Sequence, residues 1–192
     1  MHNDMFDKIK KAIVDFRKAP DKTVNPISMA RYHGVKIAHA SFDHPKLKNL
    51  IGYYKIEVLD NTKYNHTICC SDTIQPNNKW YAFVLAHELG HHFMYVMDIL
   101  QFPKQSMIVD GLSLRTFETL KNLNAYETAC NMFAREMLLP VILFLKGIEH
   151  YSSIGFNVRT ESGKNSIISL LSNDFNVPED HVHLRMEELG VL

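Results

Sequence analysis

Two histidines and a glutamate in the segment Val-Leu-Ala-His-Glu-Leu-Gly-His-His-Phe (84–93) are the residues best placed to do chemistry. His87 and His91 are four residues apart, so on a helix both imidazoles lie on one face and can bind one cation. Glu88 follows the first histidine, where it can take a proton from an attacking water instead of binding the metal. This H-E-x-x-H pattern predicts metal-assisted hydrolysis.

The surroundings of this motif make a coincidental match improbable. With 11 histidines in 192 residues, the pattern has a chance expectation of about 0.03. Residues 80–100 are apolar nearly all the way round, which predicts a helix buried on most faces. Ionisable side chains inside such a helix need partners, because burying them unpaired is costly. A bound zinc ion would be such a partner, and Mn²⁺ or another divalent ion could take its place.

The H-E-x-x-H motif supplies two ligands, and the third decides the class of enzyme. The glycine and third histidine that follow the motif in metzincins are absent, since Met94 and Met97 occupy their positions. Peptide deformylases use an upstream cysteine in a Gly-Cys-Leu-Ser segment, which Cys69-Cys70-Ser does not match. Both cysteines are better explained as core-facing thiols on a strand.

Three acidic residues downstream remain as candidates for the third ligand. Glu118 follows a polar, irregular stretch, and Glu136 is expected on an exposed face. Glu127 belongs to an apolar helical segment, with Asn131 one turn later. A second buried helix could therefore bring Glu127 to the metal and Asn131 to a hydrogen bond with one of the ligands.

The pattern of apolar residues, prolines and turn signals predicts an α+β fold in one unit, 1–192, with a small, mostly antiparallel sheet packed on the H-E-x-x-H helix and further helices. Residues 147–192 could form a C-terminal helical subdomain. Residues 101–123 and 148–163 are expected to be loops, the first with a short helix. We expect helices over 6–16, 26–34, 80–100, 124–139, 140–147, 164–175 and 178–189, and strands over 35–40, 50–59 and 64–70.

Composition excludes several classes of partner. Lys plus Arg and Asp plus Glu are both 21, so no general attraction to nucleic acid or an anionic membrane is expected. The segment 161–192 has two basic against six acidic residues, which disfavours DNA binding by the last two helices. The absence of a long apolar run or signal peptide, together with three cysteines expected to be reduced, predicts a cytoplasmic protein.

The two motifs together resemble those of the ImmA/IrrE metallopeptidases. His-Glu-Leu-Gly-His (87–91) is followed by Glu-Thr-Ala-Cys-Asn-Met-Phe-Ala-Arg-Glu-Met-Leu-Leu-Pro (127–140), close to the family's second motif, E-x-x-A-N-x-F-A-x-x-L-L-M-P. Cys130 stands where alanine is usual. The resemblance implies a zincin-like fold, His87, His91 and Glu127 as zinc ligands, and Glu88 as the catalytic base.

The resemblance also implies a substrate: a helix-turn-helix transcriptional repressor, cleaved to release its target genes in a mobile-element or stress-response circuit. Residues 64–70 could bind the substrate as an added strand. The alternatives are a metal-containing module that sequesters a repressor without cleaving it, and a general small peptidase. The donor that stabilises the oxyanion is left open among Tyr95, Tyr126, Tyr151 and His150.

Overall fold

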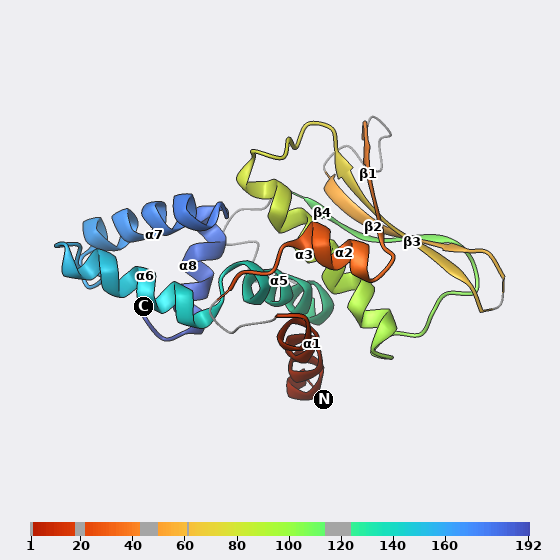
Figure 1. Cartoon of the computed structure of the whole chain (residues 1–192), viewed down its shortest axis with the longest axis horizontal. Helices are drawn as coiled ribbons and strands as arrows, with labels where there is room; N and C mark the ends of the chain where they lie inside the picture. The colour runs from red at the N-terminus through yellow and green to blue at the C-terminus, as the bar shows by residue number, and fades with distance from the viewer. Residues whose placement is uncertain (1, 18–21, 43–49, 61, 114–123) are drawn as a thin grey trace.

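The computed structural model describes residues 2–17, 22–42, 50–60, 62–113 and 124–192, so the candidate ligand Glu118 lies outside the described residues. Figure 1 shows helix α3 (Lys79–Val96) in the middle of the molecule, with the sheet on one side and helices on the other. The elements are α1 (His2–Phe16), α2 (Pro26–Tyr32), β1 (Lys36–Ala40), β2 (Leu50–Val58), β3 (Tyr64–Ser71), α3 (Lys79–Val96), β4 (Met107–Ser113), α5 (Ala125–Leu138), α6 (Val141–Ser153), α7 (Glu161–Phe175) and α8 (Glu179–Glu188).

The sheet confirms the predicted α+β class. Its strand order is β1-β3-β2-β4, with β1 parallel to β3 and the other two pairs antiparallel. Strand β3 is paired with β1 over residues 67–71 and with β2 over residues 64–70, so the expectation that 64–70 could accept an added substrate strand is wrong for residues 67–70. Within the described residues, the edges of the sheet are β1 and β4.

Helix α3 is the central element of the core. The side chain of Asn78 accepts a hydrogen bond from the Trp80 backbone N–H at its start, and α3 is buried almost continuously from Tyr81 to Tyr95. It ends at Val96, four residues before the predicted end. Asp98 adopts a left-handed conformation (φ 55°), which turns the chain out of the helix.

Two of the predicted loops contain regular structure. Residues 101–123 include strand β4. The sequence does not predict this strand, because the Asp110-Gly111 pair inside it is typical of a turn. In the structure this pair lies at an irregularity in the β2–β4 register, which passes from Lys55↔Ile108 to Tyr53↔Gly111. Helix α6 runs to Ser153 instead of ending near 147, and the expected loop over 148–163 is correspondingly shorter.

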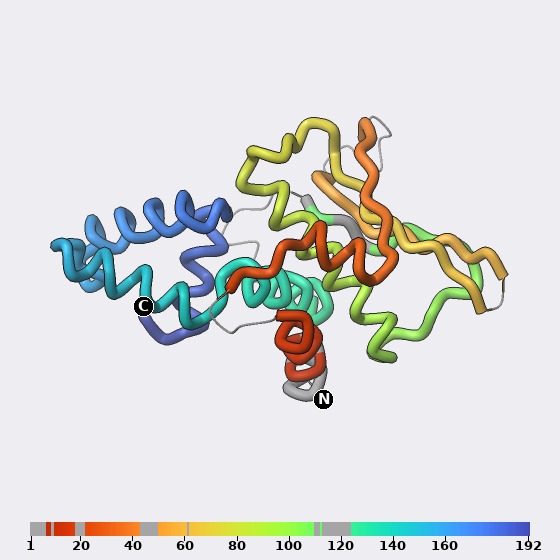
Figure 2. The backbone as a smooth tube through the Cα atoms, viewed as in Figure 1, coloured from red at the N-terminus to blue at the C-terminus, as the bar shows by residue number. Residues whose placement is uncertain are grey.

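The face of α5 that is turned away from α3 carries a buried ionic network. Glu136 pairs with Arg17, which directly follows α1, and with Arg185 of α8, so the expectation that Glu136 is exposed is wrong. Arg135, next to it, pairs with Glu188 of α8. Figure 2 shows α1 and α8 approaching α5 from different sides. One carboxylate therefore links three helices that are far apart in sequence.

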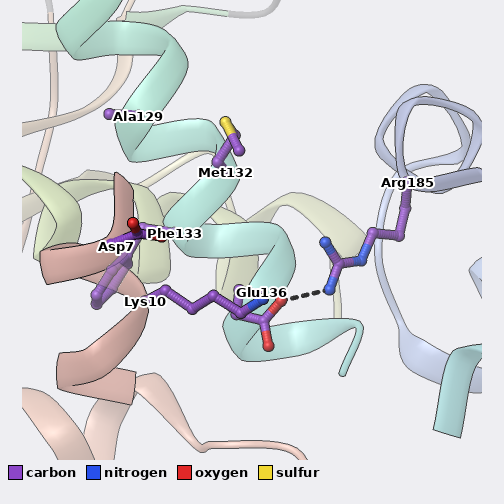
Figure 3. Close-up of a pocket in the computed structure, with 7 residues that line it drawn as sticks. All are labelled: Asp7, Lys10, Ala129, Met132, Phe133, Glu136 and Arg185. Carbon is purple, nitrogen blue, oxygen red and sulfur yellow. Dashed lines mark hydrogen bonds and ion pairs between the residues drawn. The ribbon is translucent and has the colours of Figure 1, made fainter. Parts of the chain in front are cut away.

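A pocket opens beside this network, between α1, α5 and α8 (Figure 3). Its walls combine the Glu136–Arg185 pair with Asp7 and Lys10 of α1 and an apolar patch on α5 that includes Phe133. Within the described residues, no single helix has the length and apolar character needed to cross a membrane. Helices α5 and α6 meet that test only together, and they are bent by 66°.

Glycine at position 52 lets β2 lie directly on α3. A Cβ built there would stand 2.3 Å from Val84 Cγ1, a β-branched side chain of the buried helix that has little room to move. At Gly147 of α6, a Cβ would meet only the Cδ2 methyl of Leu171, at 2.6 Å. The two glycines therefore differ in what an added methyl group displaces.

We expect Gly52→Ala to lower the free energy of unfolding by about 1–3 kcal/mol, because the methyl group overpacks the sheet–helix interface. Gly147→Ala is the matched control. Its gain in helix propensity, about 0.5–1 kcal/mol, offsets the small movement of Leu171. Urea titration followed by circular dichroism measures both, and equal losses of stability would contradict this account of Gly52.

Candidate metal centre

Helices α3 and α5 run antiparallel and bring two short stretches of sequence together. His91 faces Glu127, and His87, one turn earlier on α3, faces both Glu127 and Asn131, one turn later on α5. Asn124 begins α5 by accepting a hydrogen bond from the Glu127 backbone N–H, which places this glutamate in the first turn. The H-E-x-x-H helix and the second motif thus share one interface.

The three predicted ligands converge there. Their candidate ligand atoms all lie within 4.8 Å of one another, and each of the three residues is at most 3% exposed. The Nε2 atom of His87 is 3.5 Å from Glu127 Oε2, and the Nε2 atom of His91 is 3.2 Å from Oε1. Apart from these approaches to one another, none of the four atoms has a hydrogen-bond partner among the described residues.

This arrangement fits a divalent cation. Four buried, unpartnered polar atoms would be costly if nothing bound them. Two imidazole nitrogens and a carboxylate form a donor set that zinc accepts and that other first-row divalent ions also accept. His87, His91 and Glu127 are therefore a candidate metal-binding triad, and the donor set alone does not select the ion.

Asn131 fixes the orientation of the His87 ring. Its Oδ1 lies 2.9 Å from His87 Nδ1. An amide oxygen only accepts, so Nδ1 carries the proton and Nε2 is left with its lone pair directed toward Glu127. A histidine that binds a metal through Nε2 needs this tautomer.

Glu88 points toward the sheet instead of toward α5. Its Oε1 accepts a hydrogen bond from the Leu112 backbone N–H of β4 at 3.3 Å, whereas Oε2 has no partner among the described residues. Gly52 of β2 lies beside this carboxyl, since a Cβ built there would lie 3.5 Å from Oε1, an ordinary contact distance. Glu88 is thus held by one oxygen and has the other available.

Burial and neighbouring charge shift the pKa values of the cluster in opposite directions. Burial raises the pKa of Glu88. Burial also opposes ionisation of Glu127, but the two imidazoles outweigh it and hold the pKa of Glu127 well below its usual value. The pKa of His91 lies above its ordinary value despite burial, because of its contacts with Cys130 and Glu127. The carboxylate of Glu127 is therefore ionised, as a metal ligand must be.

His92, which follows His91, and the possible oxyanion donors have different surroundings. The Nδ1 atom of His92 lies 2.9 Å from the Tyr54 hydroxyl, on the side of α3 away from the triad. Tyr151 is hydrogen-bonded to Asp174 on α7. The other possible oxyanion donors are Tyr95, which is buried, Tyr126, which is 45% exposed, and His150, which is exposed.

Sequence reasoning missed two residues near the triad. His181 of α8 is fully buried and stacks on Phe83, one turn before His87, with ring centroids 3.6 Å apart. Cys130 packs against Gly90, the residue before His91, and its thiol and the His91 imidazole influence each other's pKa values. For Cys130, the sequence did offer a signal, because it lies three residues after Glu127 and so on the same face of the helix. No pattern in the sequence indicated the position of His181.

Comparison with known proteins gives one relevant similarity. The chain is 29% identical over 119 residues to "Uncharacterized immunity region protein 2" of Bacillus phage phi105, an alignment that covers 62% of this chain and 61% of the phage protein. The chain thus spans about three fifths of that relative's length. No protein-family model matches the chain, and no solved structure matches it.

Freshly purified protein, or protein reconstituted with zinc, is expected to hold about one divalent ion per chain, and Glu127→Ala should lose most of it. Removing the carboxylate removes one of three protein donors to the metal. The loss of metal affinity should therefore exceed the ~10–100-fold that is typical when a residue hydrogen-bonded to a ligand is removed. Elemental mass spectrometry measures the content. Glu149→Ala, an exposed glutamate of α6, is the control. Metal retained by Glu127→Ala would move the third ligand elsewhere, with Glu118 the next candidate.

Proposed function

We propose that this chain is a zinc-dependent endopeptidase that cleaves a helix-turn-helix transcriptional repressor. The observation that carries the proposal is the convergence of His87, His91 and Glu127, next to Glu88. Within the described part of the chain, the converging atoms and one carboxyl oxygen of Glu88 have no hydrogen-bond partner. Three protein ligands leave a position open, which is typical of catalytic zinc and not of structural zinc.

In this proposal the reaction depends on Glu88. A zinc ion held by the triad would polarise the peptide carbonyl and acidify the attacking water. Glu88 takes the proton from that water and passes it to the departing amine. The Leu112 N–H holds Oε1 and leaves Oε2 to carry the proton. Asn131 keeps His87 in the tautomer that binds through Nε2.

Strand β4 is the proposed binding edge for the substrate backbone. It replaces residues 64–70 in that role, because β4 is an edge strand in the described sheet and β3 is not. Its Leu112 N–H contacts Glu88, so an extended peptide lying along β4 would pass close to the proposed base. The side chains of Met107 and Ile108 on this strand are 40% and 45% exposed and could contact the peptide.

Two lines of support favour a repressor as the substrate. The paired motifs resemble those of the ImmA/IrrE metallopeptidases, and the similar phage protein is named for an immunity region. Phage immunity depends on repressors, so a role in removing a repressor is consistent with the motifs and with the name of the phage protein. We propose that residues 1–192 act as one metallopeptidase domain in the cytoplasm. Helices α7 and α8 serve as packing or docking elements that do not bind DNA.

Glu88→Gln should abolish cleavage of the repressor while leaving binding of the metal and of the repressor intact. Losing the base is expected to lower the rate by about 10²–10⁴-fold, because Gln keeps the shape of Glu but cannot take a proton. Gel assays of cleavage and pull-down of the repressor measure the two properties. An unchanged regulatory effect in cells would instead support the module that sequesters a repressor without cleaving it.

The wild-type protein should leave denatured casein intact under conditions in which it cleaves the repressor. Cleavage that requires docking of a folded partner discriminates against generic unfolded chains. Incubating both substrates in one tube and comparing their loss with time gives the answer directly. Broad digestion of casein would favour the general small peptidase.

A further inference from the structure

One turn of α5 presents three side chains to the two histidines of α3. Glu127 faces both Nε2 atoms, and Asn131 holds Nδ1 of His87. Cys130, the remaining member of this i, i+3, i+4 set, is fully buried and forms no disulfide. The function proposed above assigns it no role.

The two helices are unusually close at this cysteine. A Cβ built on Gly90 would lie 2.9 Å from Cys130 Cα and 3.2 Å from its Sγ, closer than ordinary van der Waals contact. The glycine before His91 therefore leaves space that the backbone and thiol of Cys130 fill. This approach places the thiol beside Gly90, the residue that directly precedes His91. The thiol and the His91 imidazole also influence each other's pKa values, as neighbouring groups do.

The geometry of His91 indicates which ring atom meets the thiol. Nε2 lies 3.2 Å from Glu127 Oε1 and is the atom available for a metal. Nδ1 is then the ring atom left for Cys130. For Nε2 to keep its lone pair, Nδ1 must carry the proton, and a proton on Nδ1 needs an acceptor. The sulfur of Cys130, a weak acceptor beside Gly90, is the neighbouring group that can take this role.

We propose that Cys130 is a positioning residue for His91. Its sulfur accepts the Nδ1–H of His91, and this holds the ring with Nε2 toward the metal, as Asn131 does for His87. The inference rests on the proposed metal site and extends it. In this arrangement a single turn of α5 supplies one ligand and the orienting contacts for both of the others.

Zinc affinity, measured by competition with a chromophoric chelator, tests the role of Cys130. Cys130→Ala should weaken binding about 10–100-fold, the usual effect of losing a contact that orients a ligand. Cys130→Ser keeps an acceptor of similar size and should recover most of the affinity, which a purely space-filling role does not predict. Cys69→Ala, which removes another buried free thiol on β3, is the control and should bind like wild type.

The spectrum of the Co²⁺-loaded protein separates orientation from direct ligation. Wild type should show d–d bands of a nitrogen–oxygen site without intense sulfur-to-cobalt charge transfer, and Cys130→Ala should alter the d–d bands. Strong charge transfer that disappears in Cys130→Ala would make Cys130 a ligand and overturn the positioning role. Equal zinc affinities in wild type and Cys130→Ala would also overturn it.

Two further outcomes decide between this inference and the proposed function. A wild-type protein that binds no zinc or cobalt overturns both. If wild type binds zinc and Cys130→Ala binds it equally well, only the inference about Cys130 is overturned. If Cys130→Ala does not fold, ring NMR of the zinc-loaded wild type still tests the contact. A His91 Nδ1–H protected from exchange is expected, and an unprotonated Nδ1 would contradict it.

Discussion

The structure depends on the burial of several ionisable side chains inside an apolar core. Helix α3 carries His87, Glu88 and His91 with almost no access to water, and α5 adds Glu127 and Asn131. Such groups remain in a core only when each finds a partner or a cation. Much of the local architecture serves that requirement, from the antiparallel α3–α5 pair to the backbone N–H of β4 that holds Glu88.

Close approach of backbones on both sides of α3 makes this pairing possible. Gly52 allows β2 to lie on α3 near Glu88, and Gly90 allows α5 to lie on α3 near His91. Neither position has room for an ordinary side chain without displacing its neighbours. The two glycines set the distance from the helix to the sheet and to α5, and thereby which oxygen or nitrogen each ionisable group can reach.

The sequence was sufficient to predict most of this site and less of its surroundings. His87 and His91 follow from helical spacing, and Glu127 and Asn131 from their place on an apolar segment, which the structure brings to the same interface. Strand β4 was missed because its pairing with β2 is non-local and its Asp-Gly step imitates a turn. The partners of Glu136, Arg17 and Arg185, come from distant segments whose meeting no local pattern encodes.

The carboxylate shared by Arg17 and Arg185 has a consequence for how the protein forms during synthesis. Glu136 lies on the helix that carries Glu127. One of its partners, Arg17, is near the start of the sequence, and the other, Arg185, is near its end. On the ribosome, α3, α5 and the sheet emerge while Arg185 is still untranslated, so the back of α5 has an incomplete set of counter-charges until α8 appears. Contacts between such distant segments form late. The nascent chain therefore passes through a stage in which the candidate metal ligands are already synthesised but the helix that carries Glu127 still lacks its contact with Arg185.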